Sequence, residues 1–185
     1  MLETIIIADD FYADPMEVRA FALAQSFTVK GNYPGMRTAS FLSFPVLSAI
    51  QQLVKIPITW WPTDNYNGAF QVSLSSDRTW VHADHTTCWS GVLYLTPDAP
   101  VSGGTAFFKH KATGLDWYPQ DEETRKTCDR DGSSAEQWLR TDQVANRFNR
   151  LVLFRGGRFH CSQGHFGQSK EDGRLFQTFF FNTLH

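Results

Sequence analysis

The segment RLVLFRGGRFH, residues 150–160, decides the fold class of this chain. Its apolar run at 151–154, bounded by polar and glycine residues, is typical of a short buried strand. Gly156 and Gly157 then allow a tight turn, because glycine accepts backbone conformations that other residues avoid. A second strand is therefore expected to begin at or near His160, with this imidazole held in a fixed position.

Short runs of the same kind occur along most of the chain and are separated by Gly, Pro, Asp and Ser. They predict strands at 4–8, 59–61, 68–74, 79–83, 91–95, 105–109, 150–154 and 175–182. Helices are expected from Pro15, capped by Asp14, to about Ser26, and over 45–55. A polar insertion at 112–132 is followed by a predicted helix over 133–146.

Two helices followed by many short strands predict a mainly β fold with flanking helices, in the form of a sandwich or barrel. The length of 185 residues favours a single domain. Within it, we expect residues 1–57 to form an N-terminal helical support. Residues 58–185 are expected to form the barrel core, with an insertion at about 112–147.

The composition is that of a globular protein, with 42% hydrophobic and 19% charged residues. The formal net charge of −2 gives no electrostatic reason to expect nucleic acid as a partner. No apolar run approaches the roughly 20 residues that a membrane span needs, and no secretory signal is evident. The three cysteines are scattered without CxxC spacing, which predicts a cytoplasmic protein with reduced thiols and without a zinc or disulfide framework.

His82 and Asp84 form the first candidate for a metal site. Because they lie two residues apart on an expected strand, they project from the same face, whereas His85 projects from the other. Without a third ligand, this pair would be an ordinary polar feature of a surface strand. A second imidazole from a distant strand would complete two histidines and one carboxylate, which is the facial triad of non-haem Fe(II) oxygenases.

The third ligand has four candidates, namely His110, His160, His165 and His185. Lysines on both sides of His110 disfavour a cation there, and His185 is the last residue of the sequence. His160 is favoured because a strand would hold it, whereas His165 lies in a glycine-flanked loop. Both histidines remain open at this point, and for each the alternative is an ordinary polar loop residue.

Arg174 immediately precedes the very apolar run LFQTFFF at 175–181. A guanidinium at the mouth of an apolar barrel suits a carboxylate ligand, because arginine binds carboxylates through two parallel hydrogen bonds. The alternative is an arginine at the end of a strand that simply reaches solvent.

These segments follow one another in an order that resembles a known superfamily. The chain is similar to the Fe(II)/2-oxoglutarate-dependent dioxygenases, most closely the prolyl-hydroxylase-like branch, over roughly residues 66–182. The matching segments are HAD at 82–84, GVLYLT at 91–96, VSGGTAFF at 101–108, the segment at 150–160, and Arg174. Residues 9–11 and 33–37 resemble a small uncharacterised bacterial and phage group within the same superfamily.

The resemblance implies a double-stranded β-helix, or jelly roll (a cupin-like barrel), with iron at one end. His82, Asp84 and His160 would be the metal ligands, and Arg174 would pair with the far carboxylate of the cosubstrate 2-oxoglutarate. Tyr94 aligns with a tyrosine that hydrogen-bonds the same carboxylate, and packing in the core is the alternative role for it.

The implied activity is O₂-dependent hydroxylation of a C–H bond in a protein or peptide side chain, an amino acid or a small metabolite. Because Asp84 supplies a carboxylate, halide has no vacant ligand position, and hydroxylation is favoured over halogenation. The spacing from the LVLF run to His160 matches the family, but the spacing to Arg174 keeps His165 as a rival. Two other classes remain as alternatives, namely a cupin-like metal-binding barrel without oxidative chemistry and a catalytically silent interaction module.

Overall fold

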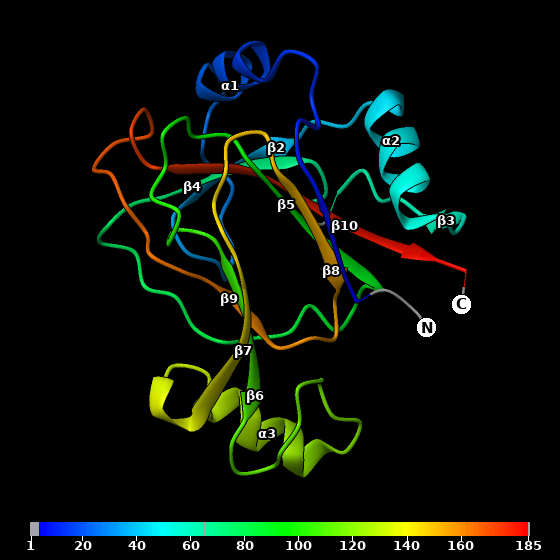
Figure 1. Ribbon diagram of the computed structural model, residues 1–185, viewed down its shortest axis with the longest axis vertical. Helices are drawn as coiled ribbons and strands as arrows, with labels where there is room; N and C mark the ends of the chain where they lie inside the picture. Colours follow the sequence, from blue (N-terminus) through cyan, green and yellow to red (C-terminus); the bar gives the residue numbers. More distant parts are fainter. Residues whose placement is uncertain (1–3, 65, 185) are drawn as a thin grey trace.

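A computed structural model describes residues 4–64 and 66–184, which form mainly antiparallel β structure (Figure 1). The strands are β1 (Ile5–Ala8), β2 (Met36–Ser40), β3 (Ile58–Trp60), β4 (Ala69–Ser73), β5 (Trp89–Tyr94), β6 (Thr105–His110), β7 (Trp138–Val144), β8 (Leu151–Arg155), β9 (His160–Ser162) and β10 (Arg174–Thr183). Seven of them form a large sheet in the order β1-β8-β5-β10-β4-β2, with β3 also paired to β10. The other three form a small sheet in the order β7-β6-β9.

The described residues also form the helices α1 (Pro15–Leu23), α2 (Phe44–Val54) and α3 (Glu122–Asp131). The side chains of Asp14 and Ser43 cap the first two by accepting hydrogen bonds from the amides of Glu17 and Val46. Both helices begin within one residue of the predicted position. The first ends at Leu23, earlier than the predicted end near Ser26.

The strand β10 separates the hydrophobic core from a cavity. Leu175 and Phe179 are fully buried and belong to the core cluster that includes side chains of α1 and α2. Phe176 and Phe180 project from the opposite face and line a cavity whose other walls include residues of the small sheet. This division follows from the alternation of side chains along a strand, and it leaves one face of the large sheet available for a site.

The burial of Phe179 leads to a prediction for stability. We expect Phe179→Ala to lower the free energy of unfolding by about 3–5 kcal/mol, because it leaves a cavity in a closely packed core. Phe180→Ala is the matched control. The Phe180 ring is only partly buried, so this variant should lose less unfolding free energy. Equilibrium unfolding in urea measures both values. Equal losses would contradict the assignment of the two faces.

The predicted helix over 133–146 is wrong. This segment contains only a short 3₁₀ turn at Ala135–Gln137, followed by β7, which pairs with β6. The helix of the insertion lies earlier, at α3, where Asp121 caps the amide of Thr124 and two glutamates occupy the first turn. The error has a physical reason: the pairing of β7 with β6 is non-local, so its partner is not visible in the sequence of β7 itself.

The predicted strand at 79–83 is also wrong as a regular strand. Its backbone makes a single bridge, between His82 and His160. Conversely, β2 was not predicted, although it begins directly after Gly35 and pairs with β4. The segment 1–57 therefore supplies the edge strands β1 and β2 to the large sheet in addition to the two helices.

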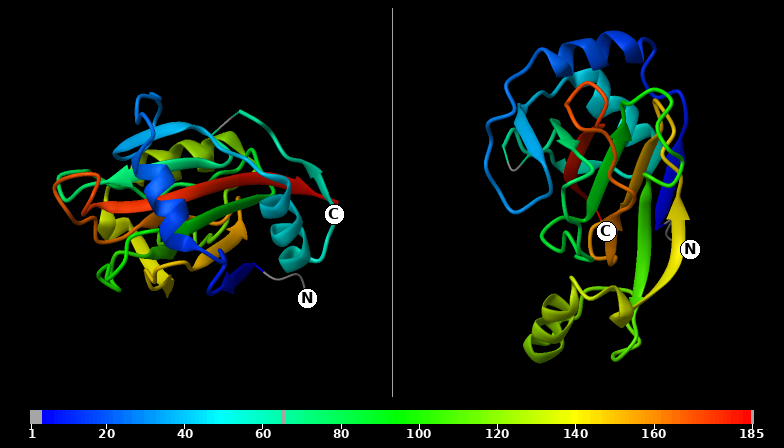
Figure 2. Two further views of the ribbon diagram at one scale, coloured as in Figure 1. Left: turned by 90° about the horizontal axis from the view of Figure 1, so that it is seen from above. Right: turned by 90° about the vertical axis from the view of Figure 1, so that its left-hand side faces the viewer.

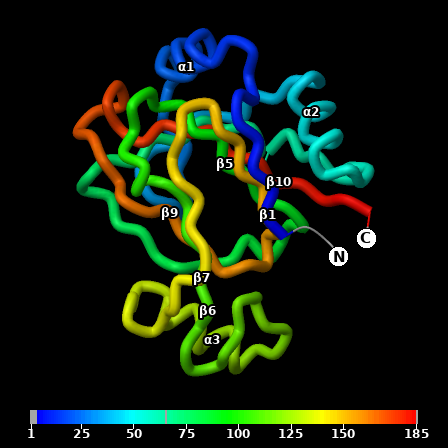
Figure 3. The backbone as a smooth tube through the Cα atoms, viewed as in Figure 1, coloured from blue at the N-terminus to red at the C-terminus, as the bar shows by residue number. Residues whose placement is uncertain are grey.

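The strands β6 and β7 connect the insertion to the rest of the molecule (Figure 3). Its helix α3 lies at the opposite end of the molecule from α1 (Figure 2). Within residues 4–64 and 66–184, no helix is long and apolar enough to cross a membrane.

Candidate metal centre

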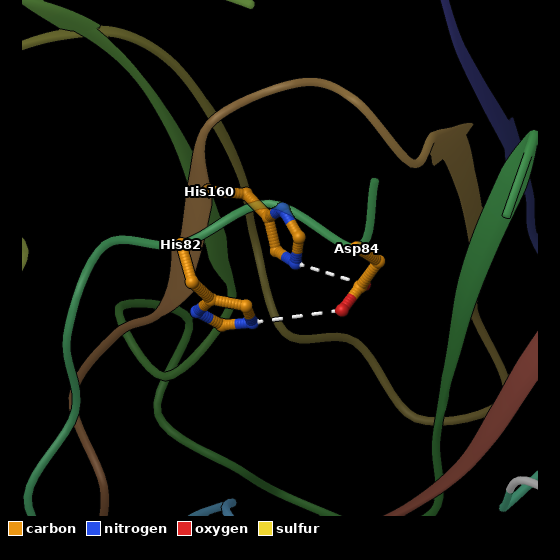
Figure 4. Close-up of side chains that lie close together, drawn as sticks. All are labelled: His82, Asp84 and His160. Atoms are coloured by element: carbon orange, nitrogen blue, oxygen red, sulfur yellow. Dashed lines mark ion pairs between the residues drawn. The ribbon is translucent and has the colours of Figure 1, made fainter. Parts of the chain in front are cut away.

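His82, Asp84 and His160 converge on one point (Figure 4). Their candidate ligand atoms all lie within 4.8 Å of one another. His160 Nε2 lies 3.3 Å from Asp84 Oδ2, and His82 Nε2 lies 3.9 Å from Asp84 Oδ1. The structure therefore brings together the three residues that the sequence proposed as ligands.

The backbone holds the two histidines side by side. The His82 amide donates to the His160 carbonyl at 3.0 Å, and the His160 amide donates to the His82 carbonyl at 2.9 Å. His160 begins β9, as predicted, and β9 pairs in turn with β6. The two imidazole rings consequently lie with their centres 4.4 Å apart. The backbone bridge between His82 and His160 thus positions the two imidazoles, in place of the regular strand that was expected at 79–83.

Both imidazoles have the orientation that a metal requires. His82 Nδ1 donates to the Trp80 carbonyl at 3.0 Å, and His160 Nδ1 donates to the Arg158 carbonyl at 2.9 Å. Because a carbonyl oxygen can only accept, each proton must lie on Nδ1. Each Nε2 therefore presents a free lone pair toward Asp84, and such a backbone hydrogen bond commonly fixes a metal-bound histidine.

The protonation states also suit a metal. Burial would raise the pKa of Asp84, but His160 and His82 in their protonated forms, together with the Ser90 hydroxyl, lower it below its usual range. Ser90 Oγ donates to Asp84 Oδ2 at 2.7 Å. Burial and the neighbouring His160 lower the pKa of His82. At neutral pH the cluster thus contains a carboxylate beside a neutral imidazole, and metal binding requires both forms.

The three side chains line a cavity of about 550 Å³, within the range of small-molecule sites. Two nitrogen donors and one carboxylate fit a divalent transition metal, Fe(II) among them. The cavity gives such a metal an open side on which further ligands can bind.

Arg174 lies in the wall of the same cavity, with only 1% of its surface exposed. Its Nε donates to the Gly103 carbonyl at 2.7 Å, and Nη2 donates to the Gly104 carbonyl at 3.2 Å. Its guanidinium carbon lies 4.4 Å from the centre of the Phe176 ring. No carboxylate of the described residues forms an ion pair with it. The alternative of a strand-end arginine that reaches solvent is therefore wrong.

Tyr94 is fully buried, and its hydroxyl is hydrogen-bonded to Thr105 Oγ1 at 2.8 Å. Its ring packs in a core cluster with Phe107 and Phe154, and it lies 5.3 Å from the guanidinium carbon of Arg174. Thr105, rather than Tyr94 itself, lines the cavity. No pattern in the sequence pointed to Thr105, because a threonine in a strand is common.

The other histidines lie apart from this cluster. His165 is hydrogen-bonded to Ser162 Oγ at 2.7 Å and to the Asp77 carbonyl at 3.1 Å. His110 is buried, with Nε2 lying 3.2 Å from Asp131 Oδ2. His85 stacks on Tyr118 with ring centres 4.2 Å apart. His185 lies outside the described residues.

The sequence of residues 71–181, more than half of the chain, matches a protein family described as "Family of unknown function (DUF6445)". The chain belongs to this family. No curated protein sequence matches this DUF6445 member.

Solved structures resemble this DUF6445 protein over almost its whole length. HygX from Streptomyces hygroscopicus, with nickel and 2-oxoglutarate bound, is 12% identical with a TM-score of 0.64, covering 97% of this chain and 83% of its own. SnoK, a non-heme alpha ketoglutarate dependent carbocyclase from nogalamycin biosynthesis, is 14% identical with a TM-score of 0.59, covering 97% and 79%. EctD from S. alaskensis, with 2-oxoglutarate and 5-hydroxyectoine, is 13% identical with a TM-score of 0.52, covering 98% and 73%. These similarities confirm the predicted jelly-roll fold, a double-stranded β-helix.

Proposed function

We propose that the protein is a non-haem Fe(II)- and 2-oxoglutarate-dependent oxygenase. The observation that carries the proposal is a single cavity that joins a cluster of two histidines and one carboxylate to a buried arginine, with which no carboxylate of residues 4–64 and 66–184 forms an ion pair. A metal with open positions beside a cationic fork is the arrangement that a chelating dicarboxylate requires. The solved structures of similar fold that contain 2-oxoglutarate support the same assignment.

In this proposal His82, Asp84 and His160 hold the metal through Nε2, a carboxylate oxygen and Nε2. Arg174 binds the far carboxylate of 2-oxoglutarate, with its fork held in place by the carbonyls of Gly103 and Gly104. Tyr94 acts on the cosubstrate site indirectly, because its hydroxyl is hydrogen-bonded to Thr105, and Thr105 lines the cavity.

When bound, Fe(II), 2-oxoglutarate and O₂ supply the oxidation of a substrate C–H bond, with succinate and CO₂ as the products of the cosubstrate. The chain itself orients the reactants and excludes water, for which the aromatic walls at Phe154, Phe176 and Phe180 are suited. We propose hydroxylation as the outcome, on a small metabolite, an amino acid, or a peptide or protein side chain. The alternative is a cupin-like barrel that binds metal without oxidative chemistry.

The test is anaerobic spectroscopy. We expect protein loaded with Fe(II) to develop a weak metal-to-ligand charge-transfer band in the visible region when 2-oxoglutarate is added. Asp84→Ala is the control, because it removes the carboxylate of the cluster and should lose the band. If metal is bound and no band develops, the 2-oxoglutarate assignment is wrong and the cupin-like alternative gains support.

A further inference from the structure

A second buried arginine, Arg37, lines the same cavity, and the proposed chemistry gives it no role. It lies on β2 and is only 6% exposed. Its partner in the strand register is Gln71 on β4. Arg37 is thus a fixed part of the cavity wall rather than a surface residue that folds inward.

Two aromatic rings and one amide hold the plane of this guanidinium. Its central carbon lies 3.7 Å from the centre of the Tyr33 ring and 4.5 Å from that of Tyr66. Gln71 Oε1 accepts hydrogen bonds from Nε, at 2.8 Å, and from Nη2. The Gln71 amide is itself anchored, because Nε2 donates to the Pro34 carbonyl at 2.6 Å. These contacts hold one edge of the guanidinium and seat it against two neighbouring rings, whose centres lie 5.4 Å apart, so the fork is preorganised for a planar acceptor.

Among the described residues, Arg37 has no acidic partner at ion-pair distance, and the charge of Asp84 acts on it only from further away. No carboxylate of the described residues forms an ion pair with it, and none of their hydrogen bonds involves Nη1. Burial lowers its pKa to about 10, so the guanidinium remains charged at neutral pH. A buried charge without a partner is unfavourable, which indicates that the compensating anion comes from a ligand.

The charge of the cavity defines how many negative charges that ligand should carry. Apart from the histidines, the charged side chains of its wall are Arg37, Arg174 and Asp84. With a divalent metal and the 2-oxoglutarate dianion in place, one positive charge remains uncompensated. A ligand with one negative charge neutralises this remaining positive charge. A phosphate dianion would leave the cavity with a net negative charge, and a neutral ligand would leave the positive charge uncompensated.

We propose that Arg37 recognises the carboxylate of a small organic acid, and that this acid is the substrate of the site. Its apolar part has aromatic surface to contact at Trp60, Trp80 and Phe180, which line the same cavity. The identification of this acid as substrate rests on the proposed oxygenase function, whereas its binding to Arg37 does not.

The test compares acids with their primary amides, which have nearly the same shape without the charge. Acetate, benzoate, phenylacetate and indole-3-acetate, each beside its amide, are titrated calorimetrically into protein loaded with Ni(II) and 2-oxoglutarate. We expect at least one acid to bind at least about tenfold more tightly than its amide, and Arg37→Met to remove this preference. Arg37→Lys should retain part of it. Arg155→Met is the matched control, because Arg155 also lies over an aromatic ring, that of Trp89, but does not line the cavity.

Three results would overturn the inference: no acid exceeds its amide, the preference survives in Arg37→Met, or that variant loses 2-oxoglutarate instead. Circular dichroism of Arg37→Met reports whether the variant is folded, so that a loss of 2-oxoglutarate binding can be assigned to the arginine. Repeating the titrations without Ni(II) and 2-oxoglutarate separates the two proposals. Failure of 2-oxoglutarate to bind to the wild-type protein contradicts the oxygenase. Absence of any acid preference in the wild-type protein under both conditions contradicts only the role of Arg37.

Discussion

His160→Ala is expected to abolish tight iron binding, whereas His165→Ala should leave it unchanged. His160 Nε2 points at Asp84 and belongs to the cluster, while both ring nitrogens of His165 are engaged by Ser162 and the Asp77 carbonyl. Removal of hydrogen-bonding partners behind a metal ligand already costs about 10–100-fold in affinity, so loss of a ligand should exceed about 100-fold. Anaerobic equilibrium dialysis with Fe(II), read as bound metal per chain, measures the effect.

Circular dichroism of both variants is the folding control, because His160 also packs against Phe154 with ring centres 4.5 Å apart. The backbone bridge to His82 does not depend on the side chain and should persist in alanine. The reverse pattern, with iron lost in His165→Ala and retained in His160→Ala, would show that the third ligand is His165.

Elements that depend on local pattern were predictable from the sequence. The run at 151–154 and the apolar run after Arg174 form β8 and β10 because each is bounded by turn residues and buried on both faces. The capped start of α1 was visible for the same reason, since an N-cap is a contact between residues three apart, whereas α2 was visible from the helical spacing of its apolar residues. The same local signals favoured His160 as the start of a strand, but the choice over His165 rested on the family resemblance, through the spacing from the LVLF run.

Elements that depend on non-local pairing were not predictable. β7 has only Trp138 and Val144 buried at its ends, so its sequence lacks the alternation of a half-buried strand. The proximity of His82 and Asp84 was predicted for a reason that proved wrong, since one bridge to His160 replaces the regular strand. Arg37 was missed because its burial exists only after β2 pairs with β4 and Tyr33 and Tyr66 pack side by side against the guanidinium.

Arg174→Met is expected to raise the Kd for 2-oxoglutarate at least about 30-fold while leaving metal binding intact. Removing one partner of a buried, hydrogen-bonded charge pair costs about 2–5 kcal/mol, and about 1.4 kcal/mol corresponds to tenfold in Kd. Methionine retains much of the apolar stem that lies against Phe176 but cannot bind a carboxylate. Calorimetric titration of 2-oxoglutarate into Ni(II)-loaded protein gives the Kd directly.

Arg174→Lys separates the contribution of the paired guanidinium donors to 2-oxoglutarate binding from that of the positive charge. Lysine retains the positive charge in the cavity but loses the paired donors that now engage Gly103 and Gly104, so we expect an intermediate Kd. The variant also keeps a cation at this position if Arg174→Met is too unstable to titrate. Wild-type affinity in both variants, together with weakened binding in Arg37→Met, would move the cosubstrate to the other arginine. In that case Arg174, which is the more deeply buried of the two cations, would lose its proposed role, and its unpaired charge would require a different anion.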